Sequence, residues 1–360
     1  MRKYIALLLS ICLIFGLIGC KNKTTEQTDG TKIEIALITD AGSIEDGSNN
    51  ELAWLGVKKY ADEHNISAQY FIPTDVSKDS YLNSIKTAVK SGAQIVVCAG
   101  YLLEEAVYDA QKQYKDVYFV LLGEEPHNSD YSDIKIGDKT ECISFSEEEA
   151  GFLAGYAAVR EGYSYLGFLG GMAEESVVKY GYGFVQGADY AAIEMGIKIY
   201  VAYVYANTFV EDVNVKNMAG NFYLNGCEAI LACGGNMNHS VIKAAEEYNT
   251  MCMLSEPIAN NMSPAVLFSM KNNVDDAVYD AVGSYYTNTF TGGQVRKLTV
   301  TEDGVGIDMD NARFSKFTDV EYDAIYSLLK SNQIKPYNGT DLTTTDELDL
   351  VNTTIVYAEL

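Results

Sequence analysis

Basic residues are scarce in this chain of 360 residues. It carries 26 lysines and arginines against 50 aspartates and glutamates, which gives a formal net charge of −24. Proteins that bind nucleic acid draw much of their affinity from clustered lysines and arginines that neutralise phosphates. The sequence shows no such cluster. Its acidic balance therefore argues against nucleic acid as a partner.

Histidine and cysteine are also few. The three histidines stand at no spacing typical of metal ligands, which argues against a zinc site. Beyond Cys20, five cysteines remain, an odd number without a CxxC pair and with mostly apolar neighbours. This pattern favours free buried thiols over a disulfide or zinc framework. With no GxGxxG or GxxxxGK[ST] motif either, we expect neither a metal nor a cofactor. The five cysteines are Cys98, Cys142, Cys227, Cys233 and Cys252.

One long apolar run is present, at the very start of the chain. Arg2 and Lys3 precede the apolar segment 4–17, and Leu17-Ile18-Gly19-Cys20 follows it. A short basic and apolar segment that ends in small residues is typical of an export signal. The tetrapeptide resembles the bacterial lipobox, which implies acylation of Cys20 and a lipid anchor on the extracytoplasmic face of the cell membrane. An ordinary secretory signal with a chance cysteine is the alternative.

The rest of the chain alternates between apolar runs of strand length and amphipathic helical stretches. Strands are expected at 33–40, 68–72, 94–99, 117–122, 142–145, 164–169, 197–205, 229–233, 251–254 and 266–270. Helices are expected at 49–64, 79–90, 103–114, 147–160, 178–194, 213–224, 239–248, 274–287 and 320–331. Several strands are apolar at consecutive positions, as in parallel strands with helices on both faces.

This alternation predicts an α/β protein with two Rossmann-like lobes, since ten strands exceed one comfortable doubly wound sheet. We expect lobe crossings near 142, 258 and 295. The predicted parts are a signal peptide 1–19, a flexible polar tether 20–31, a first lobe 32–142 plus 259–295, and a second lobe 143–258 plus 296–360. In such lobes ligands bind beyond the carboxyl ends of the strands.

The strand exits carry a family resemblance in collinear order. The segment 39–50, followed by AWLGVKKYA at 53–61, looks like the opening of the basic membrane protein family of ABC-transporter substrate-binding lipoproteins. Further similar stretches are 98–101, 149–156, 170–172, 183–187 and 206–209, within a match over about 33–330. The resemblance implies a type I periplasmic-binding fold with a hinge. It also implies a nucleoside as ligand, and a membrane permease and its ATPase as partners.

The resemblance also assigns roles to single residues. Phe209 would stack on a nucleobase, and Glu256 would hold ribose hydroxyls, because a carboxylate accepts from two vicinal donors. Asp40 can alternatively be a turn or cap residue, Phe209 a core residue, and Gly234-Gly235 a plain tight turn. The expected ligand-binding residues of the first lobe are Asp40, Asn49, Asn50, Gly100 and Tyr101. Those of the second lobe are Phe209, Gly235, Asn236 and Glu256, with Lys271 or Asn272 near the hinge.

Three positions depart from the pattern of the family. An aromatic residue of an SFN-like triplet is replaced in Ser48-Asn49-Asn50, and an aspartate of an IIDG-like motif falls on Leu122. A lysine of a VVK-like motif falls at Asn272, with Lys271 one residue early. These changes bear on which ligand is bound.

An enzyme and a sensory protein are the two other classes of function to compare with the sequence. The segment 40–46 is faintly similar to the calcium-binding aspartate motif of nucleoside hydrolases, but it lacks the paired leading aspartates. No Ser-His-Asp set, GxSxG elbow or Cys-His pair stands out, so we expect no enzyme. A sensory lipoprotein that signals to a membrane partner needs the same ligand cleft and remains an alternative to transport.

Overall fold

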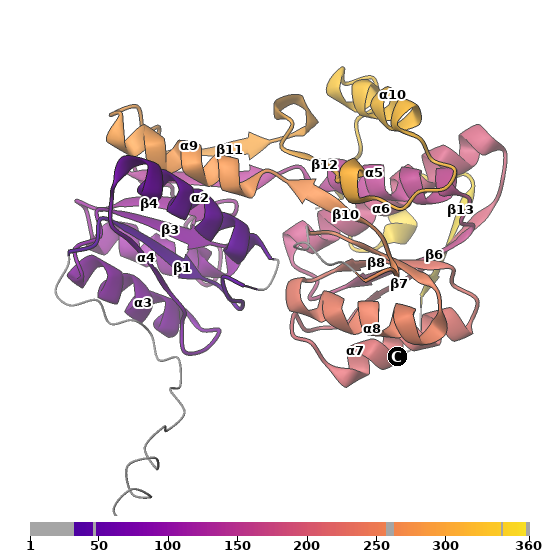
Figure 1. Cartoon of the computed structure of the whole chain (residues 1–360), viewed down its shortest axis with the longest axis horizontal. Coiled ribbons are helices and arrows are strands. Elements are labelled where there is room, and N and C mark those ends of the chain that lie inside the picture. The colour runs from indigo at the N-terminus through magenta and orange to yellow at the C-terminus, as the bar shows by residue number, and fades with distance from the viewer. Residues whose placement is uncertain (1–31, 46–47, 257–262, 340, 358–360) are drawn as a thin grey trace, which may run out of the picture. The chain divides into compact units, whose positions relative to one another are not determined.

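The computed structural model describes residues 32–45, 48–256, 263–339 and 341–357. The predicted signal peptide, lipidation site Cys20 and tether fall on 1–31 and lie outside these residues. Ile33–Leu360 form one compact unit that contains two β-sheets (Figure 1). Among the described residues, no helix combines the length and apolar character that crossing a bilayer requires.

The first sheet has six strands in the order β11-β5-β4-β3-β1-β2, and all its pairs are parallel. Its strands are β1 (Ile35–Thr39), β2 (Ala68–Phe71), β3 (Ile95–Ala99), β4 (Tyr118–Leu122), β5 (Thr140–Phe145) and β11 (Gln294–Leu298). Its helices are α2 (Asn49–His64), α3 (Lys78–Lys90), α4 (Glu104–Gln113) and α9 (Val274–Tyr286). We call this sheet with its helices the first lobe.

The second sheet has seven strands in the order β12-β10-β9-β8-β6-β7-β13, parallel except for the antiparallel pair β10 and β12. Its strands are β6 (Tyr165–Gly170), β7 (Ile199–Tyr205), β8 (Ala229–Cys233), β9 (Met251–Leu254), β10 (Val266–Asn272), β12 (Val305–Ile307) and β13 (Thr353–Tyr357). Its helices are α5 (Glu147–Glu161), α6 (Glu175–Met195), α7 (Val213–Leu224), α8 (Asn238–Tyr248) and α10 (Asp319–Lys330). These elements form the second lobe.

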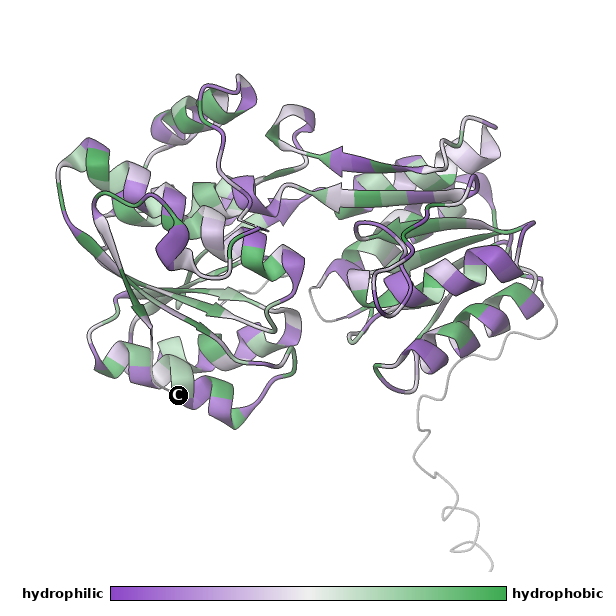
Figure 2. Cartoon of the chain, turned by 180° about the vertical axis from the view of Figure 1, so that it is seen from behind, coloured by the Kyte–Doolittle hydropathy of each residue, from purple (hydrophilic) through white to green (hydrophobic). Residues whose placement is uncertain are grey.

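The core lies between the sheets and their helices. Every residue of β1, β3 and β8 is buried, as expected for parallel strands covered on both faces. Figure 2 shows apolar residues along the strands and polar residues on the outward faces of the helices. The five cysteines predicted as free thiols are unpaired and buried, which confirms that interpretation.

The ten predicted strands and nine predicted helices are all present, with ends that differ by a few residues. Strands β11, β12 and β13 were not predicted. All three lie at sheet edges; β11 and β13 are largely polar or exposed, and β12 has only three residues. The chain passes between the sheets after Phe145, Asn272 and Leu298. Strand β10 lies inside the segment 259–295 assigned to the first lobe, yet it pairs with β9 of the second sheet. The polar stretch after Leu254 was mistaken for a crossing, but the buried strand beyond it continues the second sheet.

Helices α5 and α6 pack so closely that their backbones are in contact. A Cβ atom on Gly151 or Gly155 of α5 would overlap the carbonyl oxygen of Tyr180 or Phe184 on α6. A Cβ atom on Gly187 of α6 would likewise overlap a carbonyl oxygen of α5. The contacts advance in the same direction along both helices, so the helices are parallel and their N-termini lie together.

We expect Gly187→Ala to lower the free energy of unfolding by about 1–3 kcal/mol, because the added methyl group forces the two backbones apart. Urea denaturation of the purified chain measures this. The matched control is Gly220→Ala in α7, where a Cβ atom would meet only the movable ring of Tyr248. Equal stability of the two variants would contradict the importance of the α5–α6 contact.

Candidate ligand-binding site

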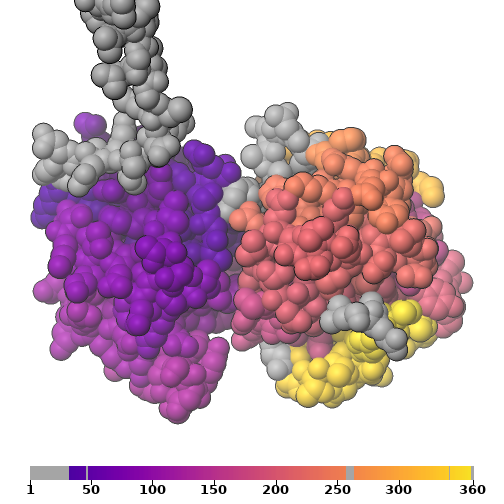
Figure 3. Space-filling view, turned by 90° about the horizontal axis from the view of Figure 1, so that it is seen from below, coloured from indigo at the N-terminus to yellow at the C-terminus, as the bar shows by residue number. Residues whose placement is uncertain are grey.

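A cavity of about 600 Å³ lies where the two lobes meet. Its walls are the segments that follow the carboxyl ends of strands in both sheets, together with the N-termini of α5 and α6. In the space-filling view the indigo-to-magenta first lobe and the salmon-to-orange second lobe meet along a boundary across the molecule (Figure 3). A cavity of this volume suits a small molecule.

The structure brings ten of the eleven predicted ligand-binding residues together in the cavity wall. They are Asp40, Asn49, Asn50, Gly100, Tyr101, Phe209, Gly235, Asn236, Glu256 and Asn272. Lys271 is exposed and does not line the cavity. Neighbouring side chains of a strand point to opposite faces. Asn272 therefore lines the cavity, whereas Lys271 lies near Asp303 and its charge helps to lower the pKa of that residue.

Asp40 is held in place by the first turn of α2. The Asn50 amide donates to Asp40 Oδ1 at 2.8 Å, and the Asp40 backbone N–H donates to Asn50 Oδ1 at 3.0 Å. Ser48 caps the helix and accepts from the Asn50 N–H at 3.1 Å. Gly100 lies against the other oxygen of Asp40 with φ +138°, a conformation and a space that exclude a side chain. Asp40 therefore reaches the cavity with a fixed orientation.

Asn49 differs from its neighbour Asn50. Asn50 is only 3% exposed, and its side chain is used by Asp40 and Ser48. Within the described part of the chain, Asn49 Oδ1 is buried without a hydrogen-bond partner, although the residue lines the cavity. Of the two asparagines predicted to bind ligand, Asn50 thus orients Asp40, while Asn49 leaves an acceptor unused.

The second lobe contributes an aromatic face. Phe209 follows β7, lines the cavity and packs in the space that Gly171 leaves open. Its ring is partly buried against the core, so it belongs both to the packing and to the cavity wall. Gly235 and Asn236 lie in a short 3₁₀ turn that precedes α8. Leu122 lines the cavity where the resemblance placed an aspartate.

Several acidic side chains in the cavity were not predicted as site residues. Among the described residues, nine carboxylates line the cavity against two lysines and one histidine, so its wall is strongly negative. Segments 123–125 and 170–174 follow the carboxyl ends of strands, where ligands are expected, and Glu124 stands two residues after Leu122, which replaces the aspartate of the family. The sequence does not distinguish the other acidic residues of these segments. The others stand at the starts of helices, where acidic residues are ordinary. The missed acids are Glu104, Glu105, Glu124, Glu125, Glu147, Glu174 and Glu175.

Glu104 and His127 face each other deep in this wall. His127 Nδ1 lies 2.8 Å from the Asn128 carbonyl oxygen, which can only accept, so Nδ1 carries a hydrogen. His127 Nε2 faces Glu104 at 3.3 Å. Either Glu104 donates to a bare Nε2, or a protonated Nε2 donates to the carboxylate. Burial raises the pKa of Glu104 to about 8.

A partly buried ion pair joins the lobes beside the cavity. Lys179 of α6 is 4% exposed and donates to Glu124 of the first lobe at 2.8 Å. It also pairs with Glu175 on its own helix at 2.7 Å. Tyr101 of the first lobe and Ser176 of the second both line the cavity. The cavity is therefore bounded by groups from both lobes that already contact one another.

Comparison with known proteins shows which family the chain belongs to. The family model described as "ABC transporter substrate-binding protein PnrA-like" matches residues 32–340. The chain belongs to this family. It is 24% identical over 338 residues to the ABC transporter nucleoside-binding protein BmpA of Lactococcus lactis, covering 87% of this chain and 93% of the relative. Basic membrane protein A1 of Borrelia garinii is 26% identical and covers 94% of this chain, and 97% of its own length is matched.

The solved structures show the fold. An ABC transporter solute-binding protein from Aeropyrum pernix superimposes with a TM-score of 0.76, at 19% identity, over 87% of this chain and 95% of that one. The expected α/β fold of type I periplasmic-binding proteins and the resemblance to the basic membrane protein family are thereby confirmed. As a member of a substrate-binding family, the chain is a binding protein and not an enzyme.

We expect Asn50→Ala to lower the free energy of unfolding by about 1–3 kcal/mol, because it removes both hydrogen bonds between the Asn50 side chain and Asp40. Asn49→Ala should change stability little, since the oxygen that it removes has no partner. Urea denaturation of both variants distinguishes the two asparagines. A larger loss in Asn49→Ala would show that their roles are reversed.

The Glu104–His127 pair predicts a pH dependence of stability. Folding raises the pKa of Glu104 from 4.5 to about 8, so the folded chain binds more protons than the unfolded chain between these values. Stability should therefore fall as the pH rises through this window, by up to about 1.4 kcal/mol per pH unit.

Glu104→Gln should flatten that decline. The amide oxygen can still accept from the Glu124 N–H, as Glu104 does at 2.8 Å. Its NH₂ group can donate to His127 as a protonated carboxyl would. Urea denaturation at about pH 6, 7 and 8 compares the variant with the parent chain. Parallel curves would reject the raised pKa of Glu104.

Proposed function

We propose that the chain is the extracytoplasmic, lipid-anchored solute-binding protein of an ABC importer. In this proposal it captures a small polar ligand, with a nucleoside as the first candidate, between its two lobes. The observation that carries the proposal is the cavity lined by strand exits of both sheets, in a chain of a substrate-binding family. A permease and its ATPase would be the partners, and Cys20 the site of the lipid anchor.

The arrangement of the cavity supports a ligand with a flat ring and several polar groups. Phe209 offers an aromatic face from the second lobe, and Asp40 offers a fixed carboxylate from the first. Glu256 lines the same cavity, at the place where the resemblance implies a contact to ribose hydroxyls. Contacts to both lobes favour the closed form, because only that form makes them together.

We expect one or more nucleosides to raise the melting temperature of the detergent-solubilised chain in a screen against nucleosides, bases, sugars and furanosides. A ligand at 100 times its dissociation constant adds about 2.7 kcal/mol. In a chain of this size that is a shift of a few degrees. Phe209→Ala should weaken a base-containing ligand about tenfold or more, since stacking on a base contributes about 1–3 kcal/mol.

Phe314→Ala is the matched control, because Phe314 is a partly buried aromatic residue that packs on Phe268 and Phe317. It should lower the melting temperature but leave affinity unchanged. Unchanged affinity in Phe209→Ala would remove Phe209 from the site. A shift with another small molecule alone would replace the nucleoside, and no shift with any compound would favour the sensory alternative.

A further inference from the structure

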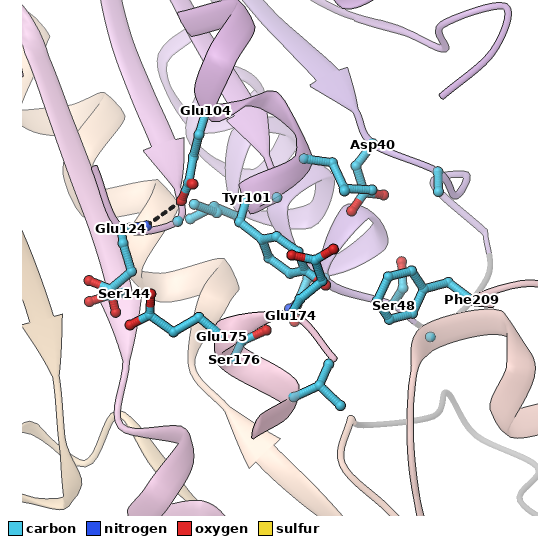
Figure 4. Close-up of a pocket in the computed structure, with 18 of the residues that line it drawn as sticks. Asp40, Ser48, Tyr101, Glu104, Glu124, Ser144, Glu174, Glu175, Ser176 and Phe209 are labelled. Atoms are coloured by element: carbon cyan, nitrogen blue, oxygen red, sulfur yellow. Dashed lines mark hydrogen bonds between the residues drawn. The ribbon is translucent and has the colours of Figure 1, made fainter. Parts of the chain in front are cut away.

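The cavity has two chemically different ends. Figure 4 shows Phe209, Ser48 and Asp40 on one side of Tyr101 and Glu104, Glu124, Ser144 and Glu175 on the other. We call the second group, together with Glu125 and Glu147 of the same wall, the acidic end. Glu174 lies beside Tyr101, between the two ends (Figure 4). Phe209, the base contact of the proposed function, and Asp40 lie at the first end and leave the acidic end unused.

The positive charges near the acidic end do not balance its carboxylates. Lys179 is shared by Glu124 and Glu175, at 2.8 and 2.7 Å. The other lysine of the wall, Lys78, pairs with Asp109 and Glu105. Among the described residues, Glu125, Glu147 and Glu174 form no ion pair.

The N-termini of α5 and α6 add about half a positive charge each. They compensate part of the excess of carboxylates and leave the rest. Because the pKa values of Glu104 and Glu147 are raised to about 8, these two carboxyl groups largely hold their protons at neutral pH, and the uncompensated negative charge comes from the other acids of the wall.

Unused hydrogen-bonding atoms of the wall give an independent indication. Ser144 is 4% exposed, and its Oγ has no partner among the described residues. The same holds for Oε2 of Glu147, which lines the same wall. Both oxygens can accept a hydrogen bond. Oδ1 of Asn49, next to Ser48 at the other end, and Oδ1 of Asn272 are further unpartnered acceptors of the cavity. A buried acceptor without a donor costs about 1–3 kcal/mol, which a donor-rich ligand would recover.

We propose that the acidic end is a subsite for an organic cation, so that the captured solute is a nucleoside bearing an ammonium or guanidinium group away from its base. The inference rests on the proposed function, which supplies the nucleoside. An ammonium group brings three donors and no acceptor, which matches both the charge and the unused oxygens of the wall. Among the described residues, no group of three or more histidines, cysteines or carboxylates is arranged to hold a metal ion, which favours an organic cation.

Protons compete with such a cation. Burial raises the pKa values of Glu104 and Glu147 to about 8. Glu104 faces His127, Glu124, Glu174 and Glu175, and Glu147 faces Lys179, Glu124 and Glu148. A bound ammonium group would favour the ionised carboxylates and release protons. Affinity for a cationic ligand should therefore rise between about pH 6 and 8, while affinity for a neutral ligand should not.

The test is calorimetric titration of the detergent-solubilised full chain with three probes: adenosine, 5′-amino-5′-deoxyadenosine and spermidine. We expect the amino derivative to bind about tenfold or more tightly than adenosine at neutral pH, with proton release. Glu174→Gln should reduce that preference to about threefold or less, because it removes one uncompensated charge. Asp323→Asn removes an exposed charge on α10 and should leave the preference intact.

The outcomes separate the two proposals. If adenosine binds and the ammonium group adds no affinity, the subsite is overturned and the nucleoside function stands. If neither nucleoside binds but spermidine does, and Glu174→Gln weakens it, the subsite stands and the nucleoside is rejected. If none of the three probes binds, both proposals are overturned.

Discussion

The backbone contact between α5 and α6 fixes the geometry of the ligand-facing side of the second lobe. Glycines on both helices allow this approach, since a side chain at Gly151, Gly155 or Gly187 would overlap a carbonyl oxygen of the opposite helix. Because the helices are parallel, their first turns lie side by side at the cavity. Glu147 begins α5 and Glu175 begins α6, and Lys179 follows one turn later. The packing of glycines thus decides which charges face the ligand.

That placement has an electrostatic consequence. Helix N-termini stabilise carboxylates within the first turn, and this partly offsets the cost of gathering acidic residues in a half-buried wall. Lys179 then links the second lobe to Glu124 of the first, so part of the negative charge is used to hold the lobes together. What remains is a wall rich in acceptors, in which burial raises the pKa of Glu104 beside His127.

Most of the fold was predictable from the sequence because its signals are local. Consecutive apolar residues indicated the buried parallel strands, and the amphipathic stretches indicated the helices. Strand β11 reads as polar (QVRKL) because it lies at the edge of its sheet, and β10 was assigned to the wrong lobe because sheet membership depends on distant pairing. The position of strand ends indicated the segments of the cavity wall, and the resemblance to the family indicated most of the predicted residues within them. Neither separated Asn272 from Lys271, whose sides depend on strand register, or identified Glu147 and Glu175, which helix packing brings to the site.

The contact between the lobes also bears on how much of the free energy of closure a ligand has to supply. A solute shifts the balance between open and closed forms only by its differential affinity for them. The Lys179–Glu124 pair joins the two lobes directly and contributes to the free energy of closure beside whatever the ligand supplies. A ligand that competed for Glu124 would weaken this pair, whereas one that used Glu174 or Ser144 would leave it intact. Selection for closure therefore favours a solute that adds donors to the unused oxygens and leaves the ion pair between the lobes in place.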